Sequence, residues 1–244
     1  MLKLQSKLDL LYEDFFEKLN IDSVTGIVNK SSRRFASKAC IGQNYPNAKR
    51  KILFISLDMG KDEKFQENTF QDYIERRNAV CTNILTDKNP HMAGVYGTAL
   101  YLLQNQYNWK ESWSLLENQT SFFKEAILLN HNTLPKDVLN YISLINFYNF
   151  VTIDRKDRTG SSDRIQINHQ FENRLLIDSI NILMPDVIIV QSQTLKNYFK
   201  THIKSKINPK TEIYIGYHPS VFGRGIKYRM PKKYIENLIE SGKL

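Results

Sequence analysis

Three polar residues of types that could share one reaction each stand at the end of a short apolar run in this chain of 244 residues: Asp58, Asn146 and His218. A carboxylate can stabilise a developing cation or activate water, and an imidazole can hydrogen-bond an oxygen on which negative charge collects. An amide carries a donor and an acceptor in one plane, which complements the edge of a nucleobase. Taken singly, each residue also has an ordinary structural interpretation as a turn former, a core amide or a core histidine. Together they suggest one pocket, provided that the fold brings the three run ends to one place.

The elements that would position these residues can be predicted from hydrophobic periodicity. Four short apolar runs, rich in β-branched and aromatic residues, are typical of buried strands: residues 52–55, 141–147, 186–190 and 212–216. Helical spacing of apolar residues lies before, between and after them: residues 4–19, 70–85, 95–104, 170–183, 194–203 and 232–241. Pro135 and the charged run 154–164 predict loops.

This alternation predicts an α/β fold, a three-layer α/β/α sandwich with a central, mainly parallel four-stranded sheet. We expect one domain over residues 1–244, with residues 1–30 as an N-terminal helical extension packed on it. Because sites in open parallel sheets form at the carboxyl ends of the strands, Asp58, Asn146 and His218 are expected at such an edge.

Composition and charge exclude several classes. The chain is 41% apolar and 24% charged, which is the balance of an ordinary globular protein. Its two cysteines, Cys40 and Cys81, cannot complete a four-ligand metal site by themselves and favour a reducing compartment. We therefore expect a cytoplasmic monomer with no metal, no cofactor, no signal peptide and no membrane span. The net charge is +9, and residues 196–244 hold 11 basic against 3 acidic residues, a distribution that suits a polyanion such as DNA or a merely solvated surface.

The order of these features resembles the uracil-DNA glycosylase superfamily. Its first motif follows the first strand, and here Ser56-Leu57-Asp58-Met59-Gly60 occupies that place, with Asp58 at the position of the catalytic Asp. The last motif of the family is matched literally by His218-Pro219-Ser220, and Asn146 falls where the family has its base-reading Asn. The segment 184–191 is similar to a family strand that follows a proline, so the resemblance covers roughly residues 49–224.

The first motif also departs from the family pattern. Ser56 and Met59 replace a Gly and a Pro, and Gly60 replaces the Tyr that excludes substituents on the 5-carbon of the base. A wall without a side chain predicts a pocket for a base larger than uracil.

The resemblance implies a monofunctional DNA glycosylase that flips a nucleotide and hydrolyses its N-glycosidic bond, leaving an abasic site. Asp58 and His218 would be catalytic and Asn146 would read the base, either uracil or a bulkier modified or damaged pyrimidine. The enzyme would act in DNA repair or in defence against phages with modified DNA. Further substrate contacts are expected from Gly60, Ser56, Leu57, Phe65 and Phe70. Contacts to DNA are expected from Ser220, from Phe222 as an apolar wedge, and from Arg224, Lys227, Arg229, Arg155, Arg158 and Arg164.

Two alternatives from other classes remain open. One is a catalytically silent DNA-binding module with the same fold. The other is a small-molecule or nucleotide hydrolase, which the lack of a P-loop or a Gly-rich dinucleotide motif weakens.

Overall fold

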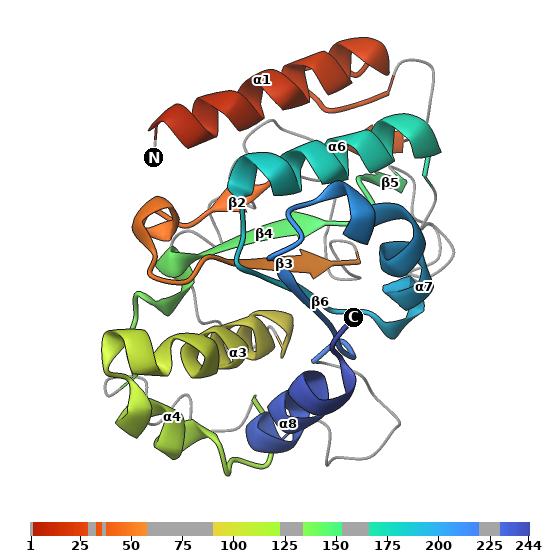
Figure 1. The fold of residues 1–244 in the computed structure, drawn as a ribbon. Helices are drawn as coiled ribbons and strands as arrows, with labels where there is room; N and C mark the ends of the chain where they lie inside the picture. Colours follow the sequence, from red (N-terminus) through yellow and green to blue (C-terminus); the bar gives the residue numbers. More distant parts are fainter. Residues whose placement is uncertain are drawn as a thin grey trace.

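The four apolar runs form the parallel strands of the central sheet in the computed structural model (Figure 1). The structure describes residues 2–28, 33–35, 38–57, 90–122, 134–152, 166–219 and 230–244. The parallel strands are β3 (Ile52–Ser56), β4 (Ile142–Asn146), β6 (Val187–Val190) and β7 (Glu212–Ile215).

The sheet has five strands in the described residues, so the prediction of four strands is wrong in its count. The additional strand is β2 (Cys40–Ile41), which pairs antiparallel with β4 at one edge and gives the order β2-β4-β3-β6-β7. Two residues carry too little periodicity to be recognised as a strand in the sequence. A separate two-stranded sheet joins β1 (Arg33–Phe35) to β5 (Phe150–Thr152).

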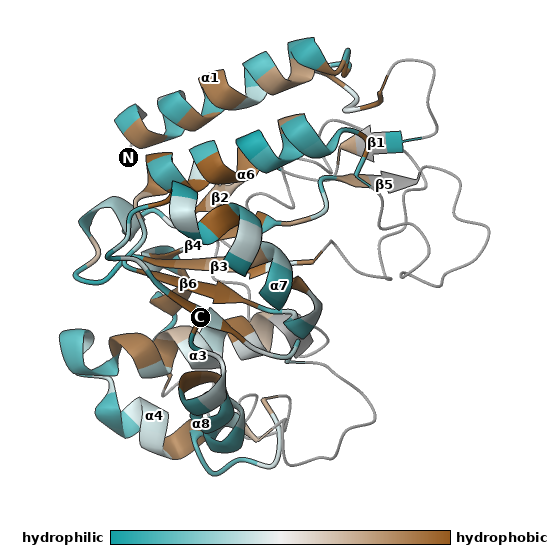
Figure 2. Cartoon of the chain, turned by 45° about the vertical axis from the view of Figure 1, so that its right-hand side comes forward, coloured by the Kyte–Doolittle hydropathy of each residue, from teal (hydrophilic) through white to brown (hydrophobic). Residues whose placement is uncertain are grey.

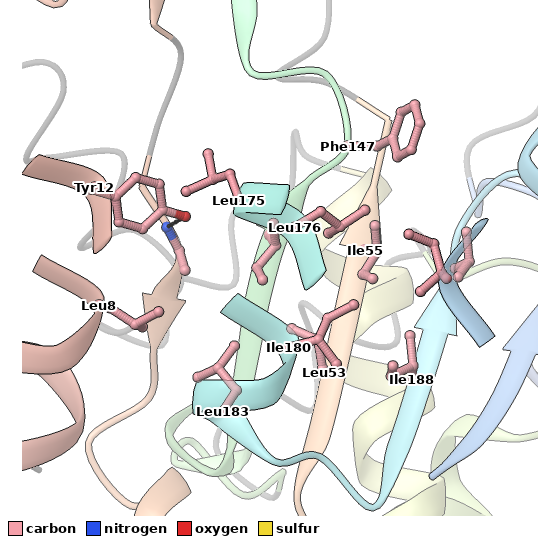
Figure 3. Close-up of a cluster of buried hydrophobic side chains, with 14 of the residues drawn as sticks. Leu8, Tyr12, Leu53, Ile55, Phe147, Leu175, Leu176, Ile180, Leu183 and Ile188 are labelled. Carbon is pink, nitrogen blue, oxygen red and sulfur yellow. Dashed lines mark hydrogen bonds between the residues drawn. The ribbon is translucent and has the colours of Figure 1, made fainter. Parts of the chain in front are cut away.

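The two faces of the central sheet carry separate hydrophobic clusters. Successive residues of a strand point to opposite faces, and accordingly Leu53 and Ile55 belong to one cluster whereas Ile52 and Phe54 belong to the other. The first face lies under α1 (Leu2–Lys18) and α6 (His169–Leu183), and Figure 3 shows their side chains meeting the strands. The second face is covered by α3 (Pro90–Tyr107), α4 (Lys110–Leu116) and α8 (Pro231–Ser241), so helices lie on both sides of the sheet (Figure 1).

The N-terminal helix is the outermost element of the first face. Leu8, Tyr12 and Phe15 are buried at helical spacing, and α1 packs alongside α6 (Figure 1). The hydroxyl oxygen of Tyr12 accepts a hydrogen bond from the backbone N–H of Ala39 at 2.8 Å, which ties α1 to the segment before β2.

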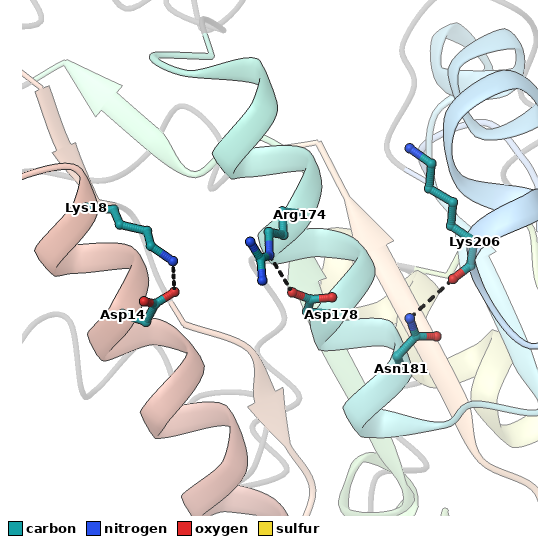
Figure 4. Close-up of polar contacts among 6 residues, drawn as sticks. All are labelled: Asp14, Lys18, Arg174, Asp178, Asn181 and Lys206. Carbon is teal, nitrogen blue, oxygen red and sulfur yellow. Dashed lines mark hydrogen bonds and ion pairs between the residues drawn. The ribbon is translucent and has the colours of Figure 1, made fainter.

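The helices carry hydrophilic residues interspersed with hydrophobic ones, and the central strands are the most continuously hydrophobic part of the view in Figure 2. Figure 4 shows three contacts on this surface: Lys18 with Asp14, Arg174 with Asp178, and the Asn181 amide donating to the backbone oxygen of Lys206 at 3.2 Å. Exposed ion pairs of this kind contribute little to stability, about 0–1 kcal/mol each.

The predicted helices 4–19, 95–104, 170–183 and 232–241 are confirmed as α1, α3, α6 and α8. The predicted helix 194–203 is helical, but its helix type changes along the segment: the 3-10 helix η3 (Gln193–Leu195), α7 (Lys196–Tyr198), the π-helix η4 (Phe199–Ile203) and the 3-10 helix η5 (Lys204–Lys206) follow one another without a break. Helix α4 was not expected, nor were the 3-10 turns η1 (Tyr45–Asn47) and η2 (Val138–Tyr141). The predicted helix 70–85 and the charged loop 154–164 lie outside the described residues. Among the described helices, none combines the length and the apolar character needed to span a bilayer.

Candidate functional site

Strands β3 and β4 end side by side in polar residues. Ser56 and Asn146 are register partners at the last position of each strand. The pairing continues beyond the strands, because the N–H of Phe147 donates to the oxygen of Ser56 and the N–H of Tyr148 donates to the oxygen of Leu57, both at 2.7 Å. The carboxyl edge of the sheet is thus held together up to the last described residue before Asp58.

The next strand, β6, places a third polar side chain beside Ser56. The backbone N–H of Gln191 donates to the oxygen of Ile55 at 2.9 Å. The Ser56 hydroxyl donates to Oε1 of the Gln191 side chain at 2.9 Å, and both side chains are almost completely buried, at 2% and 1% exposure. Asn146, Ser56 and Gln191 therefore form a row across three adjacent strands, which we call the polar row.

The polar row lies on the face of the sheet that α3 covers. Ile55, Ile145 and Val190, the residues that precede the row in each strand, belong to the cluster under α1 and α6. Since side chains alternate along a strand, the three polar residues point to the opposite face. Leu57 follows Ser56 and packs against the cluster under α1 and α6, so only its backbone is at the edge shared with the row.

One atom of the polar row is unsatisfied. Within the described part of the chain, the Nε2 atom of Gln191 is buried and has no hydrogen-bond partner. An unpaired buried donor costs about 1–3 kcal/mol, so a folded protein rarely keeps one without a reason. The Ser56 hydroxyl occupies the other end of the same amide.

His218 reaches the same edge from β7. The N–H of Gly216 donates to the oxygen of Val190 at 2.9 Å, and the oxygen of Tyr217 accepts from the Tyr234 hydroxyl of α8 at 2.7 Å. Burial raises the pKa of Tyr234 well above its ordinary value, so this hydroxyl remains a donor. His218 itself is half-buried.

Helix α3 contacts the histidine loop directly. A Cβ on Gly94 would lie 2.2 Å from Cβ and 2.4 Å from Cγ of Pro219, so only a glycine allows the first turns of α3 this close to the loop. The ring of Pro219 therefore lies directly against α3, and its fixed φ angle stiffens the backbone next to His218.

The strand order sets how far apart the predicted residues start. With a strand spacing of about 4.8 Å, β4 and β7 are separated by about 14 Å across β3 and β6. Asn146 and His218 therefore begin on opposite sides of the point where the chain leaves β3 toward Asp58. Most other predicted site residues lie outside the described residues: Asp58, Gly60, Phe65, Phe70, Arg155, Arg158, Arg164, Ser220, Phe222, Arg224, Lys227 and Arg229.

Gln191 was absent from the site residues expected from sequence, although a signal was present. It is a polar residue directly after a wholly apolar run, the same criterion that selected Asn146. Its contact with Ser56 joins residues 135 positions apart, which no local pattern predicts.

A second unexpected group near this edge is the buried carboxyl of Glu172, in the first turns of α6. Its Oε1 accepts from the N–H of Asn168 at 3.0 Å, and its Oε2 accepts from the side chain of Asn149 at 3.5 Å. Burial raises the pKa of Glu172 to about 7, against the opposing effect of these hydrogen bonds. Because Asn149 follows β4, Glu172 ties the segment after Asn146 to the start of α6.

Within the described ranges, no three His, Cys, Asp or Glu side chains gather in a way that could hold a metal ion. Comparisons of the chain with family models, with curated proteins and with solved structures found no match.

Proposed function

We propose that this protein is a monofunctional DNA glycosylase, a hydrolase of the N-glycosidic bond that leaves an abasic site. The observation that carries the proposal is the pairing of Ser56 with Asn146 at the carboxyl edge of the sheet, the edge at which the chain leaves β3 toward Asp58 and leaves β7 toward His218. We further propose that the fold is a three-layer α/β/α sandwich and that the protein acts as a cytoplasmic monomer.

The polar row supports recognition of a nucleobase. A base can be read by such a row of side chains only after its nucleotide has left the stack. The side chain of Asn146 offers a donor and an acceptor together, and it is buried at 7% exposure, where an amide discriminates between bases more strongly than it does in water.

The proposed chemistry divides two charges between two residues. Cleavage of the N-glycosidic bond develops positive charge on the sugar and negative charge on the departing base, as in other reactions with an oxocarbenium-like transition state. Asp58 would stabilise the sugar cation and orient water, and His218 would donate to the base oxygen that becomes negative. Removal of either group should cost about a hundredfold or more in rate, as for other preorganised donors.

The surface after the polar row supports a polyanionic partner. Residues 187–211 contain no Asp or Glu. All five lysines of this segment are exposed, and Lys204 also donates to the backbone oxygen of Leu244: Lys196, Lys200, Lys204, Lys206 and Lys210. Such a surface binds phosphates through counterion release, so binding to DNA should weaken steeply with salt.

The test is a single-turnover assay on duplexes that contain uracil, 5-hydroxymethylcytosine or glucosylated 5-hydroxymethylcytosine, scored for alkali-labile abasic sites. The wild-type protein is expected to release at least one of the three bases. Asn146→Ala, His218→Ala and Asp58→Asn are each expected to lower the rate about a hundredfold.

Matched controls are Asn118→Ala and His169→Ala, exposed residues outside the lysine-rich segment 187–211 that should leave the rate unchanged. Salt-sensitive binding to DNA without release of any base would instead support the silent DNA-binding module. Binding of mononucleotides without binding of duplex DNA would support the hydrolase of small molecules.

A further inference from the structure

The amide of Gln191 is held at one end and unpaired at the other. Its Oε1 accepts from the Ser56 hydroxyl at 2.9 Å, which fixes the plane of the amide and leaves Nε2 as the unused end. The residue is 1% exposed and belongs to the polar row with Asn146. A buried donor without a protein partner among the described residues is free to bind an acceptor atom of a ligand at this edge of the sheet.

We infer that Nε2 of Gln191 donates a hydrogen bond to an oxygen atom of the flipped base and thereby selects which pyrimidine is excised. This inference rests on the proposed glycosylase function and names the chemistry that the same site prefers. The required feature of the substrate is an oxygen acceptor at a point of the base other than the one that Asn146 contacts.

The spacing of the polar row allows Asn146 and Gln191 to contact two different points of one base. Asn146 and Gln191 start about 10 Å apart, across two strand spacings, with Ser56 between them. That separation is comparable with a six-membered ring flanked by two hydrogen bonds of about 2.9 Å each. The acceptor could be a ring carbonyl or the hydroxyl of a substituent on the 5-carbon, and both offer the same oxygen chemistry to an N–H donor.

The unpaired donor of Gln191 makes the site selective between bases that carry the acceptor oxygen and bases that lack it. A base that lacks the acceptor leaves Nε2 unsatisfied in the complex, whereas a base that carries it removes that cost. The single hydrogen bond is expected to favour the acceptor-bearing base about tenfold in kcat/KM, toward the upper end of the range for a neutral bond.

The experiment is a set of four duplexes that contain uracil, cytosine, 5-hydroxymethyluracil or 5-hydroxymethylcytosine. The ratio of rates with and without the 5-hydroxymethyl group measures selection of the substituent oxygen. The ratio of the uracil to the cytosine form measures selection of the 4-carbonyl. In the wild-type protein one of these ratios should be about ten, and Gln191→Met should bring that ratio close to one.

The matched control is Gln193→Met, two residues further along the chain. The amide of Gln193 is already paired, because its Nε2 donates to the oxygen of Ile215 at 2.8 Å, so both ratios should stay at the wild-type values. If Gln191→Met fails to fold in a thermal unfolding measurement, Gln191→Met combined with Ser56→Ala removes both partners of the buried hydrogen bond, leaves neither of them orphaned and should also bring the ratio close to one.

Two failures can be told apart. A wild-type protein that excises some of these bases, but whose ratios are the same in the folded Gln191 variants, overturns the role of Gln191 and leaves the glycosylase proposal standing. A wild-type protein that releases none of the four bases, nor glucosylated 5-hydroxymethylcytosine, overturns the glycosylase proposal and this inference with it.

Discussion

The contact between α3 and the histidine loop gives the sharpest prediction of this structure. A methyl group added at Gly94 would lie 2.2 Å from Cβ of Pro219, whereas ordinary contact begins at 3.4 Å. In Gly94→Ala the proline ring must therefore retreat by about 1.2 Å, and His218, the preceding residue, must move with it.

We expect Gly94→Ala to lower the rate of base release more than it lowers the free energy of unfolding. Overpacking typically costs about 1–3 kcal/mol, and replacing glycine by alanine inside a helix returns about 1 kcal/mol. The net loss in the free energy of unfolding should therefore lie between zero and about 2 kcal/mol. A displacement of about 1 Å in a catalytic group can cost about a hundredfold in rate.

The assay compares Gly94→Ala with Gly97→Ala, one turn further along α3. A Cβ on Gly97 would lie 2.5 Å from Cε1 of Phe122, a buried side chain, so it overpacks the core as well, but none of its three nearest atoms belongs to the histidine loop. Both variants should have similar unfolding free energies in urea. Only Gly94→Ala should shift the imidazole NMR signals of His218 and lower the rate of base release.

A second substitution tests whether the clash with the Pro219 ring causes the loss of rate. In Gly94→Ala combined with Pro219→Gly, the nearest remaining atom of residue 219 is Cα at 3.7 Å, so the clash disappears and the rate should recover in part. A folded Gly94→Ala protein with wild-type His218 signals and wild-type rate would refute the reasoning.

Three further predictions concern buried polar groups. Because the fold raises the pKa of Glu172 from 4.5 to about 7, the contribution of this carboxyl to stability is greatest below pH 4.5 and is lost as the pH rises to 7. Between pH 4.5 and 8, the free energy of unfolding of Glu172→Gln in urea should therefore rise relative to that of the wild type by up to about 3 kcal/mol. A difference that does not depend on pH would contradict this prediction. Ser56→Ala and Ser143→Ala each remove one buried hydroxyl bond and should each lower the unfolding free energy by about 1 kcal/mol, but only Ser56→Ala, which frees the Gln191 amide to rotate, should change the preference between bases. Tyr12→Phe leaves a buried backbone N–H unpaired and should cost about 1–3 kcal/mol in a thermal or urea unfolding measurement with no change in base preference; unchanged stability would show that the bond contributes nothing to holding α1.

Secondary structure could be predicted wherever a segment carries its own pattern. The apolar run at residues 52–55 forms β3, and the spacing of Leu8 and Phe15 forms the buried face of α1. The two-residue strand β2 could not be predicted, because its pairing with β4 depends on a partner about a hundred residues away. Residues 193–206 are helical as their apolar spacing predicts, but periodicity alone did not distinguish the changing 3-10, α and π hydrogen bonding from a regular α-helix.

The candidate site divides in the same way. By itself, the sequence determined which residues end the apolar runs, and so it identified Asn146 and His218 from local features alone. Only the tertiary structure decided that Ser56 is the register partner of Asn146, that Gln191 joins them, and that α3 closes against Pro219. The physical reason is that strand order and close approach are properties of contacts between distant parts of the chain, whereas periodicity reports only the burial of each part.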